Sequence, residues 1–102
     1  MKPSWRTDLA GYLAAFVESH RGLRSGRLFG RPVAYAGRRV FASACEDGIA
    51  ARLPPDASRA ALRRGAVKWK RGWVIFPLED ASAAERIGPF LEVAARHAAR
   101  FS

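Results

Sequence analysis

The sequence has little of what catalytic and metal sites are made from. Cys45 is the only cysteine, and His20 and His97 are the only histidines. A catalytic nucleophile needs a base within hydrogen-bonding reach, and a zinc site needs clustered ligands, whereas these residues lie far apart along the chain. The glycines match neither a phosphate-binding loop nor a dinucleotide fingerprint. We therefore expect a protein that is not an enzyme, with no catalytic residue, no metal and no cofactor.

Long hydrophobic runs are also missing. The longest apolar segments, such as 73–76, are far shorter than the roughly 20 residues needed to cross a bilayer, and no signal-peptide core opens the chain. We expect a cytoplasmic protein with no membrane partner. Cys45 cannot form an internal disulfide and lies in an alternating apolar stretch, so we expect a buried, unreactive thiol.

Positive charge is what the chain has in excess. Its 102 residues include 18 Lys and Arg against 9 Asp and Glu, a formal net charge of +9. Charge of this size attracts polyanions such as nucleic acids. The alternative is compositional, because Lys2, Lys68 and Lys70 are the only lysines and alanine is abundant, as a GC-rich genome would produce without a partner.

The first half of the chain predicts a helix followed by strands. Apolar residues recur at helical spacing over 4–20, where Ser4 or Thr7 can cap the helix. Segment 21–31, with three glycines and four arginines, predicts a mobile or irregular connection. The period then changes to two, and three segments joined by tight turns predict an antiparallel meander: 33–36, 40–45 and 49–53.

The second half predicts a short helix, a hairpin and a last helix. Asp56 is the expected N-cap of the short helix, and Gly65 its terminator. Residues 82–85 match a capping box, but Pro89 conflicts with a helix that begins there, so the helix either kinks or starts near Gly88. The fold class is therefore α+β, one domain over 1–102, with an antiparallel sheet of about five strands in the order helix, three-strand meander, helix, hairpin, helix.

Segment 67–76 alternates cations with indoles around the expected hairpin turn. A two-residue turn at 71–72 pairs Lys70 with Trp73 and leaves one indole exposed, whereas a three-residue loop pairs Trp69 with Trp73. The second register gives the cleaner apolar face, so we expect core tryptophans under a solvated basic tip. An aromatic platform that stacks on nucleic-acid bases is the alternative.

Several short segments, in this order, resemble the N-terminal domain of the TfoX/Sxy family of bacterial competence regulators. They are Leu28-Phe29-Gly30, Ala34-Tyr35, Val40-Phe41-Ala42, Asp47-Gly48-Ile49, Arg52-Leu53, Gly65-Ala66, Trp73-Val74 and Pro77, spread over residues 5–101. The family usually has Met-Phe-Gly-Gly where this chain has Leu28-Phe29-Gly30-Arg31. The resemblance implies the element order given above and offers no established catalytic residues.

We expect a non-enzymatic binding or regulatory module whose partner is nucleic acid or a regulatory protein. Phosphate contacts would come from the two basic turns: Lys68, Lys70 and Arg71 in one, Arg38 and Arg39 in the other. Two alternatives stay open. One is a protein-interaction domain or homodimer with incidental charge, and the other is small-ligand binding or undetected catalysis in a pocket at Tyr35 and Arg52.

Overall fold

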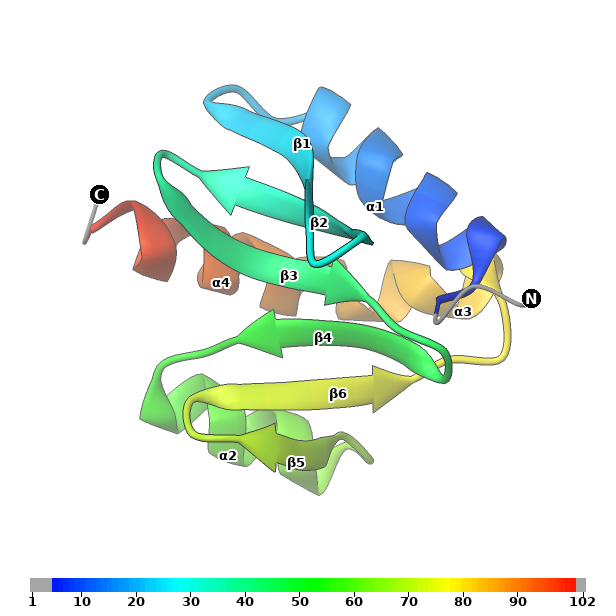
Figure 1. Ribbon diagram of the computed structural model, residues 1–102. Helices are drawn as coiled ribbons and strands as arrows, with labels where there is room; N and C mark the ends of the chain where they lie inside the picture. The colour runs from blue at the N-terminus through cyan, green and yellow to red at the C-terminus, as the bar shows by residue number, and fades with distance from the viewer. Residues whose placement is uncertain (1–4, 101–102) are drawn as a thin grey trace.

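The structure is a computed structural model that describes residues 5–100 (Figure 1). Its elements are α1 (Thr7–Glu18), β1 (Leu23–Leu28), β2 (Arg31–Ala36), β3 (Arg39–Ala44), β4 (Gly48–Arg52), α2 (Pro55–Arg63), β5 (Val67–Lys70), β6 (Trp73–Pro77), α3 (Ala81–Ala84), the 3₁₀ turn η1 (Glu85–Ile87) and α4 (Gly88–Ala99). The expected α+β class is confirmed. The sheet has six strands rather than about five, in the order β1-β2-β3-β4-β6-β5.

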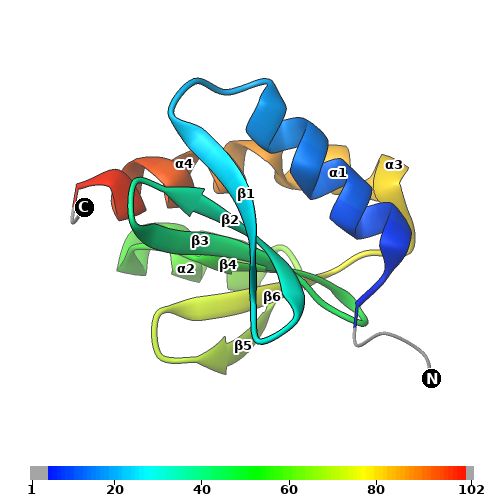
Figure 2. The same cartoon turned by 45° about the horizontal axis from the view of Figure 1, so that its top comes forward.

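The molecule has two layers, with the helices on one face of the antiparallel sheet (Figures 1 and 2). α1 packs on β1 to β3, α4 on β2 to β4, and α2 on β6. No helix formed by residues 5–100 covers the other face, which we call the open face. The sheet is strongly twisted, so the β1–β2 hairpin crosses in front of the central strands in Figure 1.

The strand register separates the two faces residue by residue. Residues paired across neighbouring strands share a face, and successive residues alternate. One paired row faces the helices and runs through Ala34, Ala42, Ala51, Val74 and Lys68. The next row faces away and runs through Gly26, Val33, Ser43, Ala50, Ile75 and Val67. The first row supplies the sheet side of the core, because its four apolar members are at most 1% exposed.

Strand β1 corrects the expectation that 21–31 is an irregular connection. Leu23 to Leu28 pair with β2 along their whole length. The segment is an edge strand with no residue in the buried class, so the alternation of apolar side chains that marks β2 and β3 is missing from it. Gly26 has its own packing reason, because the ring of Tyr35 lies against it, 2.6 Å from where a Cβ would stand.

Helix α1 confirms the apolar pattern but not the capping. Leu9, Leu13, Phe16 and Val17 are buried against the sheet. The N-cap position is Arg6, whose side chain makes no cap hydrogen bond, so the expectation for Thr7 was wrong. The other candidate cap, Ser4, lies outside the described residues.

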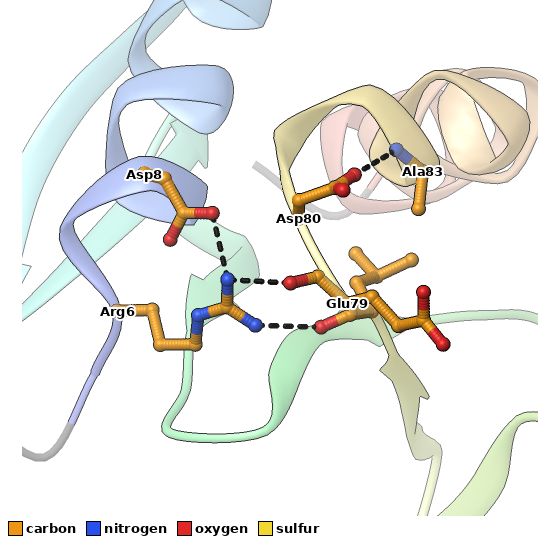
Figure 3. Close-up of polar contacts among 6 residues, drawn as sticks. Arg6, Asp8, Glu79, Asp80 and Ala83 are labelled. Atoms are coloured by element: carbon orange, nitrogen blue, oxygen red, sulfur yellow. Dashed lines mark hydrogen bonds and ion pairs between the residues drawn. The ribbon is translucent and has the colours of Figure 1, made fainter.

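Arg6 ties the start of α1 to the loop after β6 (Figure 3). Its guanidinium donates to the carbonyl oxygens of Leu78 at 2.9 Å and Glu79 at 2.6 Å, and to the Asp8 carboxylate at 2.8 Å. Glu79 lies 73 residues from Arg6 in the chain, so this contact joins the N-terminal helix to a distant segment.

The remaining helix boundaries follow proline and glycine. The expectation that Asp56 caps α2 was wrong, because Pro54 holds the N-cap position and Asp56 instead pairs with Arg59. Gly65 ends α2 as expected, with φ +101°. Pro89 lies in the first turn of α4, so the second of the two alternatives for the last helix is correct. Within residues 5–100, no helix has the length and hydropathy needed to traverse a bilayer.

Candidate binding face of the sheet

The β5–β6 hairpin combines the two expected registers. Lys70 pairs with Trp73 across the turn formed by Arg71 and Gly72, as a two-residue turn requires. A bulge at Trp69 then shifts the register, so Lys68 pairs with Val74 and Val67 with Ile75, as the three-residue loop requires. Gly72 has φ +83°, the left-handed conformation that both kinds of tight turn favour at a glycine.

The two tryptophans share a face, but that face is the open one, so the expectation of core tryptophans was wrong. Trp69 is 40% exposed and Val67 is 55% exposed, whereas Val74 and Phe76, on the opposite face, are buried. The alternation is as predicted, and the helices cover the other side of it. The indole rings of Trp69 and Trp73 meet edge to face, with centroids 5.8 Å apart.

Lys70 is positioned by these rings. Its ammonium nitrogen lies 4.4 Å from the ring centroid of Trp69 and 5.5 Å from that of Trp73. Both distances fall within the roughly 6 Å over which a cation is attracted to an aromatic ring. Trp69, Lys70 and Trp73 therefore form one cluster on the open face, which we call the Trp–Lys cluster.

The Trp–Lys cluster forms one wall of a hollow of about 450 Å³ on the open face. The opposite wall is the end of the β1–β2 hairpin, and the floor belongs to β2 and β3. The full lining is Leu28, Phe29, Arg31, Val33, Val40, Ser43, Trp69, Lys70 and Trp73. Val33 and Ser43, on the floor, are buried although no helix covers them, because the other lining residues surround them.

The hollow offers stacking surfaces, positive charge and a hydroxyl. Ser43 is 6% exposed. Its Oγ makes only long hydrogen bonds, of 3.4 Å to the Pro32 carbonyl and 3.3 Å to the Ala44 carbonyl. No lining residue is a carboxylate, an imidazole or a thiol. Such a set can hold a flat, anionic ligand, and it supplies no base for proton transfer.

Charge is divided strongly between the sheet and the rest of the molecule. None of the nine acidic residues lies in a strand. The cationic residues of the strands are Arg24, Arg27, Arg31, Arg39, Arg52, Lys68 and Lys70. The guanidinium of Arg24 lies 4.2 Å over the ring of Tyr35, which adds a second cation–aromatic pair.

The two basic turns predicted from the sequence lie at the same end of the sheet. The β2–β3 turn with Arg38, the β5–β6 turn with Arg71 and the C-terminal end of β4 all lie on the left in Figure 1. The opposite end carries the β3–β4 turn with Glu46 and Asp47, where the Leu78 N–H donates to the Asp47 carbonyl. The acidic residues of the strand turns therefore lie at the opposite end of the sheet from Arg38 and Arg71.

The five candidate residues nevertheless face different surroundings. Lys70 belongs to the Trp–Lys cluster, whereas Lys68 and Arg71 line a separate hollow beside α2. Arg38 is exposed in its turn, and Arg39, half-buried at the start of β3, lines a small hollow with Arg52 and His97.

Sequence reasoning missed the β1–β2 side of the open face. Arg31, Leu28 and Phe29 reach the hollow only because the twisted hairpin brings them opposite the tryptophans. Phe29 carried a local signal, since it is an apolar residue in a tight turn; it is 96% exposed and has φ +52°. The hollow on the open face includes neither Tyr35 nor Arg52, the pair proposed for a small-ligand pocket.

The thiol and one imidazole have structural surroundings. Cys45 is buried as expected, and burial raises the pKa of its thiol, which keeps it protonated and weakly nucleophilic. His20 stacks on Phe16 with centroids 4.1 Å apart, and its Nε2 lies 3.3 Å from the Glu92 carboxylate. Within residues 5–100, no three His, Cys, Asp or Glu side chains gather into a group able to hold a metal ion.

Comparison of the chain with protein-family models, curated proteins and solved structures gives no significant match in any of the three. The resemblance to the TfoX/Sxy N-terminal domain is tested by none of them and stays a prediction.

Proposed function

We propose that this domain is a non-enzymatic module that binds single-stranded nucleic acid on the open face of its sheet. The observation that carries the proposal is the Trp–Lys cluster at the rim of a hollow, on a sheet whose strands contain no acidic residue. A regulatory role, as the resemblance to competence regulators implies, would act through this binding.

Stacking favours a single strand over a duplex. Unpaired bases can lay their flat faces on exposed aromatic rings, whereas the bases of a duplex are already stacked on one another. Trp69 is 40% exposed and stands at the rim of the hollow, where a base can reach it. Stacking accepts every base, so we expect little sequence preference.

Phosphate contacts supply the rest of the binding free energy. Lys70 and Arg31 lie on opposite walls of the hollow. Arg24, on β1, lies over the ring of Tyr35, on β2. A strand that crosses this face meets cations on both sides and no carboxylate from the sheet. Binding through released counterions must weaken as salt rises.

The direct test is fluorescence anisotropy with labelled single-stranded and duplex DNA and RNA, all bearing 5′-hydroxyl ends, at two salt concentrations. We expect single strands to bind more tightly than duplexes and to lose affinity in the higher salt. Trp69→Ala should weaken single-strand binding by about tenfold, since a base stacked on an aromatic ring contributes roughly 1–3 kcal/mol. Leu62→Ala is the matched control, because Leu62 is 39% exposed on α2.

Lys70→Gln tests the charge contribution against Arg63→Gln, which removes the same charge from the exposed end of α2. Lys70→Gln should lower both the affinity and the salt slope, and Arg63→Gln should change neither by much. Absence of single-strand binding at low salt would overturn the proposal, as would equal losses in the test and control variants.

Protein association through the same face is the second candidate. Phe29 is 96% exposed and Leu28 is 42% exposed at the end of the β1–β2 hairpin, which is typical of an apolar contact surface. A homodimer joined at the open faces would bring arginines and lysines together, which is unfavourable. Sedimentation velocity at several concentrations tests it, and a Phe29→Ser variant should abolish any dimer seen.

A further inference from the structure

A second hollow, of about 830 Å³, lies beside α2, at the end of the sheet where β4 ends and β5 turns into β6. Arg52, Lys68 and Arg71 line it, together with the hydroxyl-bearing Ser58 and the imidazole of His97. No lining residue is acidic. These side chains come from β4, α2, β5, the β5–β6 turn and α4, so only the folded chain assembles them.

A backbone hydrogen bond holds the turn of this hollow in place. The Leu53 N–H, one residue past the end of β4, donates to the Gly72 carbonyl at 3.0 Å. This bond fixes the β5–β6 turn, and with it Arg71, beside Arg52. The cations are therefore brought together by the backbone and not by flexible side chains alone.

Lys68 faces this hollow because of its place in the register. It pairs with Val74 in the row that faces the helices, yet β5 is the outermost strand, so the side chain emerges beside Ser58. Lys70 belongs to the other face and contacts the indoles. Two lysines of one strand thus serve two different surfaces.

Three cations of this hollow, Arg52, Lys68 and Arg71, have no ion pair with an acidic side chain of residues 5–100. Asp56 of α2 is paired with Arg59. Arg52, Lys68 and Arg71 repel one another and concentrate a positive potential in the hollow.

We propose that this hollow binds a phosphate monoester. A guanidinium presents two parallel N–H donors that match two phosphate oxygens, and an ammonium and a hydroxyl complete the set of donors. A monoester carries close to two negative charges at neutral pH, so a group of three cations attracts it more strongly than a phosphodiester, which carries a single charge.

The site is independent of the proposed function, because it uses none of the side chains of the Trp–Lys cluster. The monoester could be the end of a nucleic-acid strand or a free mononucleotide, and both present the same group. The ligand arms of the experiment separate these two sources.

The experiment is calorimetric titration with inorganic phosphate and with a nucleoside 5′-monophosphate, using sulfate and the unphosphorylated nucleoside at matched ionic strength as ligand controls. We expect phosphate and the monophosphate to bind and the nucleoside not to bind. Arg52→Gln should weaken phosphate binding by about tenfold or more, since a hydrogen bond between charged groups contributes roughly 1.5–3 kcal/mol.

Arg63→Gln is the matched control, because it removes one positive charge from the exposed end of α2, outside the lining of the hollow, and should bind phosphate as the unchanged protein does. A second readout guards against loss of folding: in low salt without phosphate, Arg52→Gln should melt no lower than the unchanged protein, because removing one cation relieves repulsion. Phosphate should raise the melting temperature of the unchanged protein and not that of Arg52→Gln.

A 5′-phosphorylated oligonucleotide compared with its 5′-hydroxyl form identifies the source. If the phosphorylated oligonucleotide binds more tightly and Arg52→Gln removes the difference, the ligand is a strand end. If the two oligonucleotides bind equally and the mononucleotide also binds, the ligand is a free nucleotide. Failure of phosphate and mononucleotide to bind, or equal binding by Arg52→Gln and Arg63→Gln, would overturn the proposal. The single-strand test with 5′-hydroxyl ends would stand either way.

Discussion

The carbonyl oxygen of Phe76 lies 1.8 Å from the point where a Cβ atom on Gly48 would stand. Gly48 opens β4 and pairs with Pro77, so the two backbones approach closely there. An Asp-Gly pair such as Asp47-Gly48 is typical of a tight hairpin turn, but the φ of Gly48 is not in the left-handed region. Its role is to leave room for β6.

Gly48→Ala should therefore destabilise the protein by about 3 kcal/mol or more, because a backbone carbonyl cannot move aside without breaking the β4–β6 pairing. Urea denaturation measures the free energy of unfolding. Gly11→Ala is the control: nothing lies within 4 Å of its Cβ position in α1, and it should gain about 1 kcal/mol. Similar effects of the two changes would contradict the close-approach explanation.

Asp80, not Ser82, caps the short helix α3. Its carboxylate accepts a hydrogen bond from the Ala83 N–H at 2.9 Å (Figure 3), while Ser82 is exposed inside the first turn. Asp80→Ala should cost about 1 kcal/mol of stability by thermal or urea unfolding, and Ser82→Ala close to nothing. The reverse order would restore the capping box that the sequence suggested.

Phe29 combines full exposure with a left-handed backbone. Its φ of +52° is unfavourable for a residue with a Cβ, and its ring buries almost no surface. Phe29→Gly should leave stability unchanged or raise it by up to about 1 kcal/mol, since relief of strain offsets the entropy of glycine. Leu28→Gly, in extended strand β1, should instead lose stability. A clear loss in Phe29→Gly would show that the ring makes a stabilising contact.

Ionisation of Cys45 should make stability fall at alkaline pH. Burial raises the pKa of this thiol in the folded protein, so the unfolded chain loses the proton first as pH rises past the ordinary thiol value of about 8.5. Below that pH both states are protonated and the contribution is constant.

Urea denaturation on either side of that pH, compared between the unchanged protein and Cys45→Ala, isolates the thiol. The comparison is needed because burial, Glu85 and Glu92 raise the pKa of Tyr12 in the same direction. The fall with pH should be smaller in Cys45→Ala. An equal fall in both proteins would mean that the Cys45 thiol ionises as readily folded as unfolded.

Local patterns were sufficient where the physical cause is local. Helical spacing marked the buried face of α1, and Gly65 marked the end of α2. Pro89 limited the last helix to two alternatives, a kink or a start near Gly88, and the structure has the second. Strand alternation also grouped Trp69 with Trp73, because side chains on one side of a hairpin share a face whatever lies around them.

Tertiary structure decided which face of the sheet the helices cover. Trp69 is exposed and Trp73 only half-buried because α1, α2 and α4 all pack on the opposite face, which no property of residues 67–76 dictates. β1 escaped sequence reasoning since an edge strand of a twisted sheet buries too little to need an apolar pattern. Arg52 meets Arg71 because β6 inserts between β4 and β5 and a single backbone bond holds the turn. Period and composition fix which residues share a face, but only the packing of distant segments determines which face is buried and which cations meet.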